Sequence, residues 1–358
     1  MKILYIINSL DGGGGALPLP DVIDVMRDAG HAVLVVSLME RDGRARPLLS
    51  AAGIPYVVIG GAKRRFASTA IRLDKLIWEW RPDMLWTSLT HATITGEIAG
   101  LMRGIPVTSW LHNAWLKPIN RRILRQTARF TRHWVADSRT VADFGAESLG
   151  IDPANISIWP LFIARETAVV TRTAGPQFRL GSLGRLHRNK GYDQLIRAVH
   201  VLQRETPEIA AQLSVHIAGE GAELPSLQAL CKSLNVHNVH FDGFTADPAA
   251  FLATLDGYIQ PSHHEGLCIA AHEAMLARLP IIASPVGEMA NSIRTSGGGL
   301  LAGWADVPAL AAAIRQLITD RAGAGAMGEA GQGYVAEYFS ADAFTARGRA
   351  ALRAAGAD

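Results

Sequence analysis

Short apolar runs that end at loops containing glycine or proline recur along this chain, and they constrain its fold more than any other feature. Phe178–Leu183 and Gly257–Gln260 are two such runs, and a helical pattern follows each loop, over residues 192–203 and 267–279. Buried strands that alternate with helices are typical of parallel sheets covered by helices on both faces. The sequence therefore predicts an α/β protein built from doubly wound parallel sheets.

The length of the chain indicates two domains. At 358 residues it exceeds what one hydrophobic core usually holds, and 49% of the residues are hydrophobic, which is enough for two buried sheets. Regular periodicity lapses over residues 161–177, so we expect the domain boundary there. The predicted domains are residues 1–165 and 176–335. The stretch 321–333, rich in glycine and alanine, is interpreted as a connector at most.

The stretch most informative about function is residues 262–273, Ser-His-His-Glu-Gly-Leu-Cys-Ile-Ala-Ala-His-Glu. It follows the predicted strand Gly257–Gln260, and open α/β sheets bind ligands at the carboxyl ends of their strands. Backbone N–H groups at the start of the following helix would be unpaired and would suit an anion. These groups belong to Gly266, Leu267, Cys268 and Ile269.

Two carboxylates flank this helix start. Glu265 precedes the helix and Glu273 lies about two turns along it, so they could accept hydrogen bonds from two ends of a polyhydroxylated ligand. An isolated pair of this kind is more often an acid favoured by the helix dipole together with a solvated surface acid. The choice depends on what the rest of the chain places nearby.

A short loop, residues 184–191, connects the strand Phe178–Leu183 to its helix. It holds two cations, Arg185 and Lys190, between glycines, an arrangement that suits neutralisation of a diphosphate. A basic surface loop without a function is the alternative for such a stretch taken alone. Beside Glu265 and Glu273, the loop shifts the interpretation towards a binding site.

The series Gly184-Arg185-Leu186, Lys190-Gly191, Glu265 and Glu273 resembles the GT4 group of retaining glycosyltransferases with the GT-B fold. The resemblance covers nearly the whole chain. It implies two Rossmann-like domains facing one another across a cleft, the first on the acceptor side and the second binding a nucleotide sugar. It also implies that a last helix, near residues 341–358, packs back on the first domain. Weaker matching segments are residues 3–15, 110–113, 214–221, 241–244 and 280–287.

This resemblance implies transfer of a hexose from a nucleotide diphosphate sugar, UDP-linked or GDP-linked, to an acceptor hydroxyl with retention at the anomeric carbon. The departing diphosphate gains charge, which preorganised cations and amides would stabilise. The implied catalytic residues are Arg185, Lys190, Glu265 and His112. The implied donor-binding residues are Gly13, Gly14, Gly184, Glu220, Phe244, Gly266, Leu267, Cys268, Ile269 and Glu273. Glu273 would hold the ribose and Glu265 the sugar hydroxyls.

Several histidines are candidate site residues. His112 ends a predicted strand, and the resemblance places a histidine near the reacting sugar, although a lone histidine is more often structural. His91 has a similar position and weaker support. His264, Cys268 and His272 are four residues apart and could suggest a metal face, but His264 precedes the predicted helix. No Asp-x-Asp pair is present to hold a divalent ion, and the resemblance implies that no metal and no other cofactor is needed.

The glycine loop at residues 12–15 follows the first predicted strand, as in a dinucleotide-binding fold. The fingerprint Gly-x-Gly-x-x-Gly nevertheless fails, because Leu17 stands where the third glycine is needed. The Leu-Pro-Leu-Pro stretch 17–20 would also delay the helix. The resemblance implies instead that Gly13 and Gly14 allow this loop to approach the donor phosphate closely. The proline-rich stretch departs from the pattern of the family.

Positive charge is concentrated in the first half of the chain. The formal net charge is +3, and residues 1–166 hold 20 Lys and Arg against 15 Asp and Glu. Much of the excess lies at helical spacing between Lys117 and Arg132, and a second cluster lies at 63–66. Such a helix suits an anionic membrane surface or a polyanion, and a solvated helix face is equally common. No nucleic-acid recognition motif accompanies the basic residues.

No apolar run approaches the ~20 residues needed to span a bilayer, and the first strand begins directly after Met1. Cys231 and Cys268 form no disulfide framework, which fits a reducing compartment. We therefore expect a cytoplasmic protein, in contact with the inner face of the membrane if its acceptor is lipid-linked.

Two alternatives to glycosyl transfer remain at this stage. A sugar-nucleotide 2-epimerase shares the two-domain scaffold and needs no acceptor, but its characteristic Arg-Pro start after the first strand is missing. A non-catalytic scaffold of the same fold is the other alternative. The intact set of Arg185, Lys190, Glu265 and Glu273 argues against a retired site.

Overall fold

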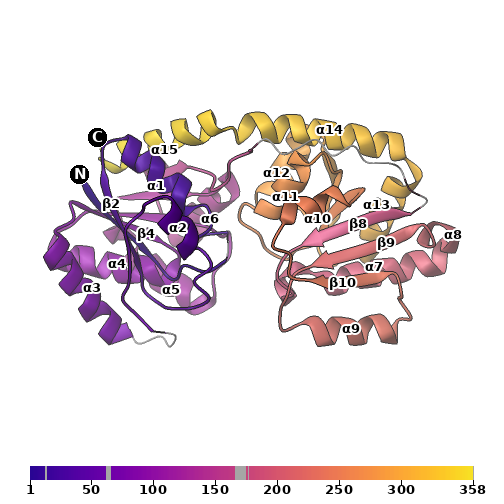
Figure 1. The fold of residues 1–358 in the computed structure, drawn as a ribbon, viewed down its shortest axis with the longest axis horizontal. Coiled ribbons are helices and arrows are strands. Elements are labelled where there is room, and N and C mark those ends of the chain that lie inside the picture. Colours follow the sequence, from indigo (N-terminus) through magenta and orange to yellow (C-terminus); the bar gives the residue numbers. More distant parts are fainter. Residues whose placement is uncertain (13, 62–65, 166–174, 176, 358) are drawn as a thin grey trace. The chain divides into compact units, whose positions relative to one another are not determined.

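The computed structural model describes residues 1–12, 14–61, 66–165, 175 and 177–357. The chain forms two compact units, Met1–Ile163 with Ala341–Asp358 as the first and Ala164–Ser340 as the second. Each unit is a parallel β-sheet with helices on both of its faces (Figure 1). The predicted α/β class with two doubly wound sheets is confirmed.

The first unit contains a sheet that, over the described residues, has seven parallel strands in the order β3-β2-β1-β4-β5-β6-β7. Its strands are β1 (Lys2–Ile7), β2 (Ala32–Ser37), β3 (Tyr56–Val58), β4 (Met84–Ser88), β5 (Val107–Leu111), β6 (His133–Ala136) and β7 (Ile156–Ile158). Its helices are α1 (Leu19–Asp28), α2 (Arg46–Ala51), α3 (Phe66–Trp80), α4 (Thr90–Arg103), α5 (Pro118–Thr127), η1 (Ala128–Phe130), α6 (Arg139–Leu149), η2 (Pro153–Asn155) and α15 (Ala341–Ala355).

The second unit contains a sheet of six parallel strands within the described ranges, in the order β10-β9-β8-β11-β12-β13. Its strands are β8 (Phe178–Leu183), β9 (Leu213–Ala218), β10 (Val239–Gly243), β11 (Gly257–Gln260), β12 (Ile281–Ala283) and β13 (Gly299–Leu301). Its helices are η3 (Arg188–Lys190), α7 (Tyr192–Glu205), α8 (Pro207–Ala210), α9 (Leu224–Ser233), α10 (Pro248–Ala253), α11 (Ile269–Leu276), α12 (Gly287–Ser296), α13 (Val307–Thr319) and α14 (Arg321–Tyr338).

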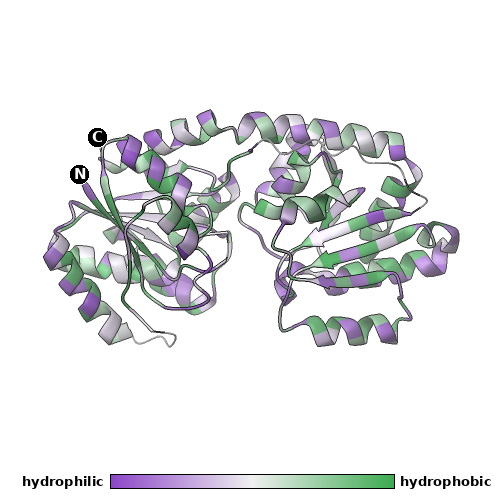
Figure 2. Ribbon diagram, viewed as in Figure 1, coloured by the Kyte–Doolittle hydropathy of each residue, from purple (hydrophilic) through white to green (hydrophobic). Residues whose placement is uncertain are grey.

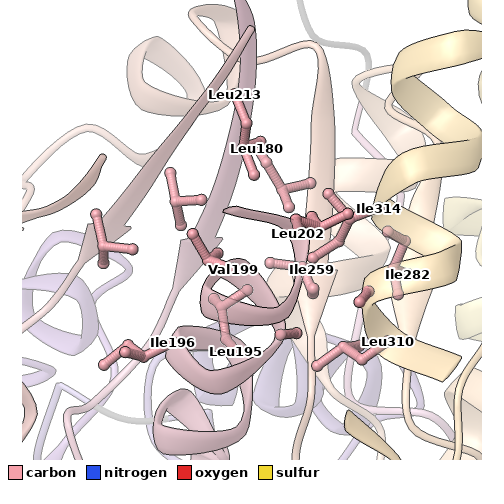
Figure 3. Close-up of a cluster of buried hydrophobic side chains, with 14 of the residues drawn as sticks. Leu180, Leu195, Ile196, Val199, Leu202, Leu213, Ile259, Ile282, Leu310 and Ile314 are labelled. Atoms are coloured by element: carbon pink, nitrogen blue, oxygen red, sulfur yellow. The ribbon is translucent and has the colours of Figure 1, made fainter. Parts of the chain in front are cut away.

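The core of the second unit lies between its sheet and helices α7 and α13. Leu195 and Val199 of α7 and Ile314 of α13 pack against Leu180 of β8 and Ile259 of β11 (Figure 3). All five side chains are fully buried, and each such burial contributes about 1.5–3 kcal/mol. The strands of the first sheet are largely hydrophobic, whereas the helices and the visible strands of the second sheet mix hydrophobic with hydrophilic residues (Figure 2). This core fixes the strand ends from which the functional loops leave.

The last helix, α15, belongs to the first unit, where it contacts α1, β6 and β7. Phe344 of this helix packs on Trp159, with ring centroids 5.3 Å apart. Gly348 allows the close approach, because a Cβ at this position would lie 2.5 Å from the Trp159 ring. No described helix combines the length and apolar character that crossing a bilayer requires.

The interpretation of residues 321–333 as a connector is wrong, because they belong to the 18-residue helix α14. Asp320 begins this helix by accepting a hydrogen bond from the Gly323 N–H at 2.8 Å. Gly328 serves packing, because a Cβ at this position would lie 2.2 Å from the Arg278 carbonyl oxygen. Close approach to α11 and α12 outweighs the poor intrinsic helix propensity of glycine.

Candidate functional site

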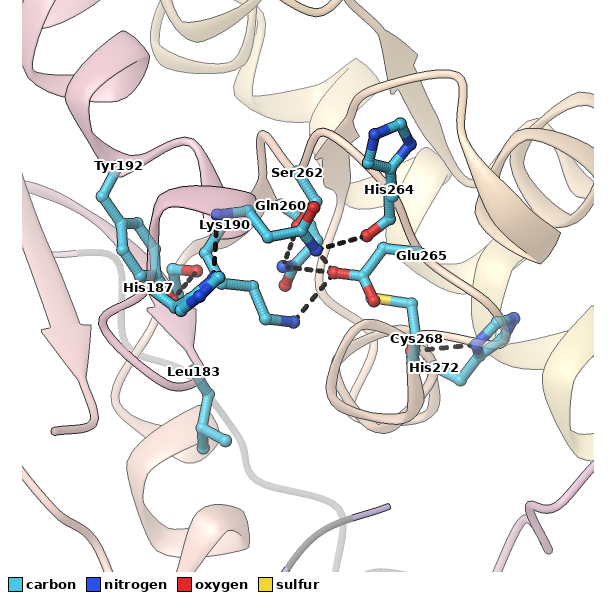
Figure 4. Close-up of polar contacts among 12 residues, drawn as sticks. Leu183, His187, Lys190, Tyr192, Gln260, Ser262, His264, Glu265, Cys268 and His272 are labelled. Atoms are coloured by element: carbon cyan, nitrogen blue, oxygen red, sulfur yellow. Dashed lines mark hydrogen bonds and ion pairs between the residues drawn. The ribbon is translucent and has the colours of Figure 1, made fainter. Parts of the chain in front are cut away.

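The cation Lys190 and the carboxylate of Glu265 form an ion pair at the carboxyl edge of the second sheet (Figure 4). Lys190 ends η3 in the β8–α7 loop, and Glu265 lies in the β11–α11 loop, so the two neighbouring strands bring them together. Lys190 Nζ is 2.8 Å from Glu265 Oε1, and the side chains are only 21% and 12% exposed. Burial alone would lower the pKa of Lys190, but the Glu265 carboxylate raises it well above its usual value. Lys190 therefore stays charged at neutral pH.

Within the described residues, the hydrogen bonds to the Glu265 side chain all go to one of its oxygens. Besides Lys190, Glu265 Oε1 accepts from Ser262 Oγ at 2.6 Å and from Gln260 Nε2 at 3.3 Å. Gln260 is fixed in turn by the Tyr258 hydroxyl, which donates to Gln260 Oε1 at 3.0 Å. Glu265 Oε2 has no hydrogen bond from any described residue, so it is the oxygen available to a ligand.

The two loops that hold this pair are joined directly. Asn189 Nδ2 donates to the His264 carbonyl oxygen at 2.7 Å, and the His263 N–H donates to the Asn189 carbonyl oxygen at 2.8 Å. Gly191 has a φ of +68°, and a Cβ there would lie 1.9 Å from the Pro261 carbonyl oxygen. Only glycine fits this contact, which explains why a glycine closes the η3 turn.

Helix α11 begins at Ile269, two residues later than the sequence pattern indicates. Cys268 has a left-handed backbone with φ of 64°, which delays the first helical turn. Within the described ranges the N–H groups of Gly266, Leu267, Cys268 and Ile269 have no hydrogen-bond acceptor, as an anion site at a helix start requires. Burial raises the pKa of the Cys268 thiol, which favours the protonated, weakly nucleophilic form at neutral pH.

Glu273 lies on α11 with its side chain partly buried. Burial raises the pKa of this carboxyl to about 7. No described residue donates a hydrogen bond to the carboxylate, and both Glu273 and Glu265 raise the pKa of the intervening Cys268 thiol through their charge. Both carboxylates therefore lie near Cys268, and among the described residues Glu273 has no hydrogen-bond donor that would stabilise its charged form.

The remaining predicted residues of the second unit occupy neighbouring loops. Gly184 adjoins the ion pair, since a Cβ there would lie 3.3 Å from Lys190 Cε. The Glu220 carbonyl oxygen accepts from the Leu186 N–H at 2.9 Å and so joins the β8 and β9 loops. Phe244, just after β10, is 55% exposed. Arg185 is exposed and forms no ion pair within the described ranges, so only Lys190 of the two predicted cations belongs to the buried cluster.

His112 in the first unit has partners at both ring nitrogens. Nδ1 lies 3.0 Å from Asp137 Oδ2, and Nε2 lies 2.8 Å from Ser88 Oγ. Trp110 stacks on the imidazole and donates from Nε1 to Asp137 Oδ1 at 2.7 Å. Ser88, His112 and Asp137 stand at the carboxyl ends of β4, β5 and β6, which are neighbours in the sheet. Their common position at strand ends was the available signal for Ser88 and Asp137, which sequence reasoning missed.

The other predicted site residues of the first unit do not form a recognisable cluster among the described residues. Gly14 is exposed in the loop after β1, and Gly13 lies outside the described residues. His91 is buried near the start of α4. The basic residues at 63–65 also lie outside the described residues.

The proposed basic helix is shorter than its sequence pattern suggests, because α5 ends at Thr127. Arg132 lies beyond η1, and its guanidinium packs against Gly356 of the first unit instead of joining the basic face. Arg121, Arg122 and Arg125 are exposed along α5. Ile119 on the same helix is 62% exposed.

The spacing of His264, Cys268 and His272 does not produce a metal face. His264 is exposed on the loop, whereas His272 is buried, with Nε2 2.9 Å from Ser292 Oγ and Nδ1 3.1 Å from the Cys268 carbonyl oxygen. Burial lowers the pKa of His272 to about 4. In the described part of the chain no three His, Cys, Asp or Glu side chains gather as a metal site.

Two family profiles match this sequence. Glycosyltransferase Family 4 matches residues 13–167, and Glycosyl transferases group 1 matches residues 177–320. The two matches together cover most of the chain and divide it as its two sheets do. The chain belongs to the GT4 group of glycosyltransferases.

Curated relatives span several acceptors. The GDP-mannose-dependent alpha-(1-6)-phosphatidylinositol monomannoside mannosyltransferase of Mycolicibacterium smegmatis is 32% identical over 74% of this chain and 75% of its own length. The 2-deoxystreptamine glucosyltransferase of Streptomyces kanamyceticus is 25% identical over 79% and 80% of the two chains. The D-inositol 3-phosphate glycosyltransferase of Arthrobacter sp. is 29% identical over 53% of this chain, which spans about half (46%) of that relative.

Solved structures with the same fold cover the whole chain. Anabaena Alr3699/HepE in complex with UDP and glucose has a TM-score of 0.84, with 21% identity over 99% of both chains. The apo form of the lipopolysaccharide outer core galactosyltransferase WaaB has a TM-score of 0.76, with 17% identity over 99% of both chains. With the two doubly wound sheets, these likenesses confirm the predicted GT-B fold.

Proposed function

We propose that this chain transfers a hexose from a nucleotide diphosphate sugar to a hydroxyl of a glycan or lipid-linked acceptor, with retention at the anomeric carbon. The observation that supports this best is the charged Lys190 paired with Glu265 at the carboxyl edge of a parallel sheet, beside four backbone N–H groups that have no acceptor among the described residues. A diphosphate and the hydroxyls of a sugar match these groups. The donor is UDP-linked or GDP-linked, in keeping with the GDP-mannose in one relative's name and the UDP in one neighbour's complex.

The reaction breaks the bond between the anomeric carbon and the diphosphate oxygen, and it forms a bond from the same carbon to the acceptor oxygen. The leaving phosphate takes the acceptor proton on the same face of the sugar, so the configuration is retained. Negative charge grows on the departing oxygen, and Lys190 with the amides of Gly266 and Leu267 stabilises it in a site that needs little reorganisation. Arg185, exposed on the same loop as Lys190, adds a second positive charge. In this proposal these cations do the work that a divalent metal does at other diphosphate sites.

The two carboxylates hold the polyhydroxylated parts of the donor. Glu265 Oε1 is occupied, so Oε2 accepts from a hydroxyl of the sugar. Glu273 accepts from the ribose hydroxyls, and these hydrogen bonds favour its charged form and lower the raised pKa on binding. The backbone beside Phe244 and Glu220 meets the base.

His112 is assigned to the donor sugar on the resemblance to GT4 enzymes. Asp137 faces Nδ1, which leaves Nε2 as the ring nitrogen opposite the Ser88 hydroxyl. A sugar hydroxyl that donates to Nε2 would take the place of Ser88. Asp137 would keep the imidazole in the required orientation.

The acceptor side involves α5 in this proposal. Exposed Arg121, Arg122 and Arg125 with exposed Ile119 form a basic and apolar surface suited to the anionic inner leaflet, where each cation contributes about 1 kcal/mol. We place the protein at the inner face of the cell membrane, in synthesis of a cell-surface glycan. Replacement of Arg121 and Arg125 by glutamate should abolish sedimentation with phosphatidylserine vesicles; unchanged sedimentation would exclude α5 as the contact.

The first test of donor binding is a thermal-shift screen against UDP, GDP, ADP, NAD and their common sugar conjugates. A ligand at 100 times its dissociation constant stabilises the fold by about 2.7 kcal/mol. Glu273→Ala and Lys190→Ala should lose the shift, and the exposed Glu329→Ala and Lys232→Ala serve as matched controls. A shift with NAD alone, or with no nucleotide, would contradict the proposal.

Retention requires its own measurement. With the donor and an acceptor identified, proton NMR of the product gives the anomeric configuration of the new glycosidic bond. The proposal expects the α-linked donors to yield α-linked products. Conversion of the donor sugar to its C2 epimer without acceptor would identify an epimerase instead.

A further inference from the structure

A cavity of about 420 Å³ opens in the second unit beside, and separate from, the residues assigned to the donor. It lies between the first turns of α7 and the facing side of α9. Residues of the loops after β8, β9, β11 and β13 also line it, so it lies at the edge at which parallel sheets bind ligands. Its volume is within the range of about 300–1,000 Å³ typical of small-molecule sites.

The cavity is lined by both apolar and polar side chains. Buried Tyr192 and Leu227 contribute the apolar surface from α7 and α9. Asp193 and Arg197, one turn apart on α7, and Ser226 on α9 add groups that donate and accept hydrogen bonds. Apolar surface with a few polar groups suits an amphipathic ligand of one or two rings.

An aromatic platform lies at the rim. Trp304 in the β13–α13 loop is 43% exposed, although large apolar side chains are usually covered. His263, which also lines the cavity, has its imidazole ring against this indole ring. The C–H face of a pyranose ring packs well on an exposed indole, and the sugar hydroxyls then point to polar neighbours.

The charges around the cavity cancel. Asp193 and Glu223 are opposed by Arg188 and Arg197, and Arg188 Nε is 3.3 Å from Glu223 Oε1. Burial, with the neighbouring imidazole of His264, lowers the pKa of His263, so this ring is neutral at neutral pH. A balanced set of this kind favours an uncharged ligand rich in hydroxyls over a phosphate.

The cavity and the candidate active site have different lining residues, but two loops contribute to both. Arg188 faces the cavity and Lys190 faces Glu265 from the same short turn, η3. His263 and Glu265 do the same from the β11–α11 loop, and Asn189 joins the two loops by hydrogen bonds. A ligand in the cavity would therefore contact the loops that hold the ion pair.

We propose that this cavity is a second carbohydrate site, which holds an uncharged glycan segment with one pyranose ring on Trp304. The inference rests on the proposed function in that a glycan acceptor is the expected source of such a segment. The cavity belongs to the second unit alone, so the site needs no particular arrangement of the two units.

Calorimetric titration of the full chain tests the proposal, with maltose and the methyl α-glycosides of glucose, mannose and galactose as probes. At least one saccharide should bind with a millimolar dissociation constant, and Trp304→Ala should weaken binding about tenfold. Trp78→Ala is the matched control, because Trp78 on α3 is 62% exposed and belongs to the other unit. The control variant should bind the saccharide as the original chain does.

Two further measurements separate this site from the donor site. Glu273→Ala should lose nucleotide binding, if the proposed function holds, and should keep saccharide binding. Inorganic pyrophosphate should not displace the bound saccharide. The proposal is overturned if no probe binds up to its solubility limit, if Trp304→Ala binds as tightly as the original chain, or if pyrophosphate displaces the sugar.

Discussion

The buried carboxylate of Glu273 should lower the stability of the unliganded protein while it contributes to nucleotide binding, and both effects can be measured. Burial raises the pKa of its carboxyl from 4.5 to about 7, and no described residue donates a hydrogen bond to it. Above pH 7 the group is charged in the folded and unfolded chain alike, and the folded chain bears the full cost of burying that charge. The cost declines as the pH falls through 7 and is absent below about 4.5, where both states are protonated. Glu273→Gln should therefore stabilise the unliganded protein at pH 8 and change little at pH 4.5.

The size of the effect follows from the shift. The difference between 4.5 and about 7 corresponds to about 3 kcal/mol. Partial exposure of the side chain to water reduces this to roughly 1–2 kcal/mol. For a unit of this size each kcal/mol moves the melting temperature by about 2–4 °C, so the expected gain at pH 8 is about 4 °C.

The assay is thermal unfolding of Glu273→Gln from pH 4.5 to 8, with and without the donor nucleotide. Loss of the charged acceptor should weaken nucleotide binding about tenfold or more, so the variant gains stability as it loses affinity. The exposed Glu329→Gln on α14 is the control and should change neither quantity. A variant that is less stable at pH 8, or equally stabilised at every pH, would refute the reasoning about burial.

Three other predictions concern single contacts. Lys190→Met leaves the carboxylate of Glu265 buried without its cation and should lower the free energy of unfolding by about 3 kcal/mol in urea denaturation at pH 7, and an unchanged midpoint would contradict the ion pair. Gly328→Ala should destabilise the second unit by about 1–3 kcal/mol, because its Cβ meets a carbonyl oxygen. Gly333→Ala on the same helix has open space around it and should stabilise the unit by up to about 1 kcal/mol. Calorimetry of both variants checks the packing of α14. Asp137→Asn removes the charge that orients His112. This variant should reduce kcat at least about tenfold and leave the melting temperature little changed. An unaltered kcat would show that Asp137 has only a structural role.

The sequence predicts strands well where apolar runs are short and bounded by glycine or proline. Phe178–Leu183 and Gly257–Gln260 agree with β8 and β11 at both ends, because a buried parallel strand needs a continuous apolar run. The start of α11 was placed two residues early, since nothing in the local pattern reveals the left-handed backbone at Cys268. Helix α14 was missed because glycine content argues against a helix unless the packing partner is known.

Some features of the candidate site could also be predicted from the sequence, and others could not. The positions of Lys190 and Glu265 follow from strand order, since loops after adjacent strands meet at one edge of the sheet. That the pair is buried, and that Arg185 stays outside it, depends on side-chain packing that spacing does not encode. The cavity beside Trp304 joins four loops far apart in the sequence, so no local motif could indicate it.

The composition of α14 has a consequence for the order of folding. Each glycine costs about 1 kcal/mol of helix stability relative to alanine, and five of them fall within these 18 residues, so an isolated peptide of this sequence would be a random coil in water. The helix therefore depends for its stability on packing against α11 and α12. We expect α14 to form late, after the second sheet, and its backbone amides to exchange with deuterium earlier than those of α7.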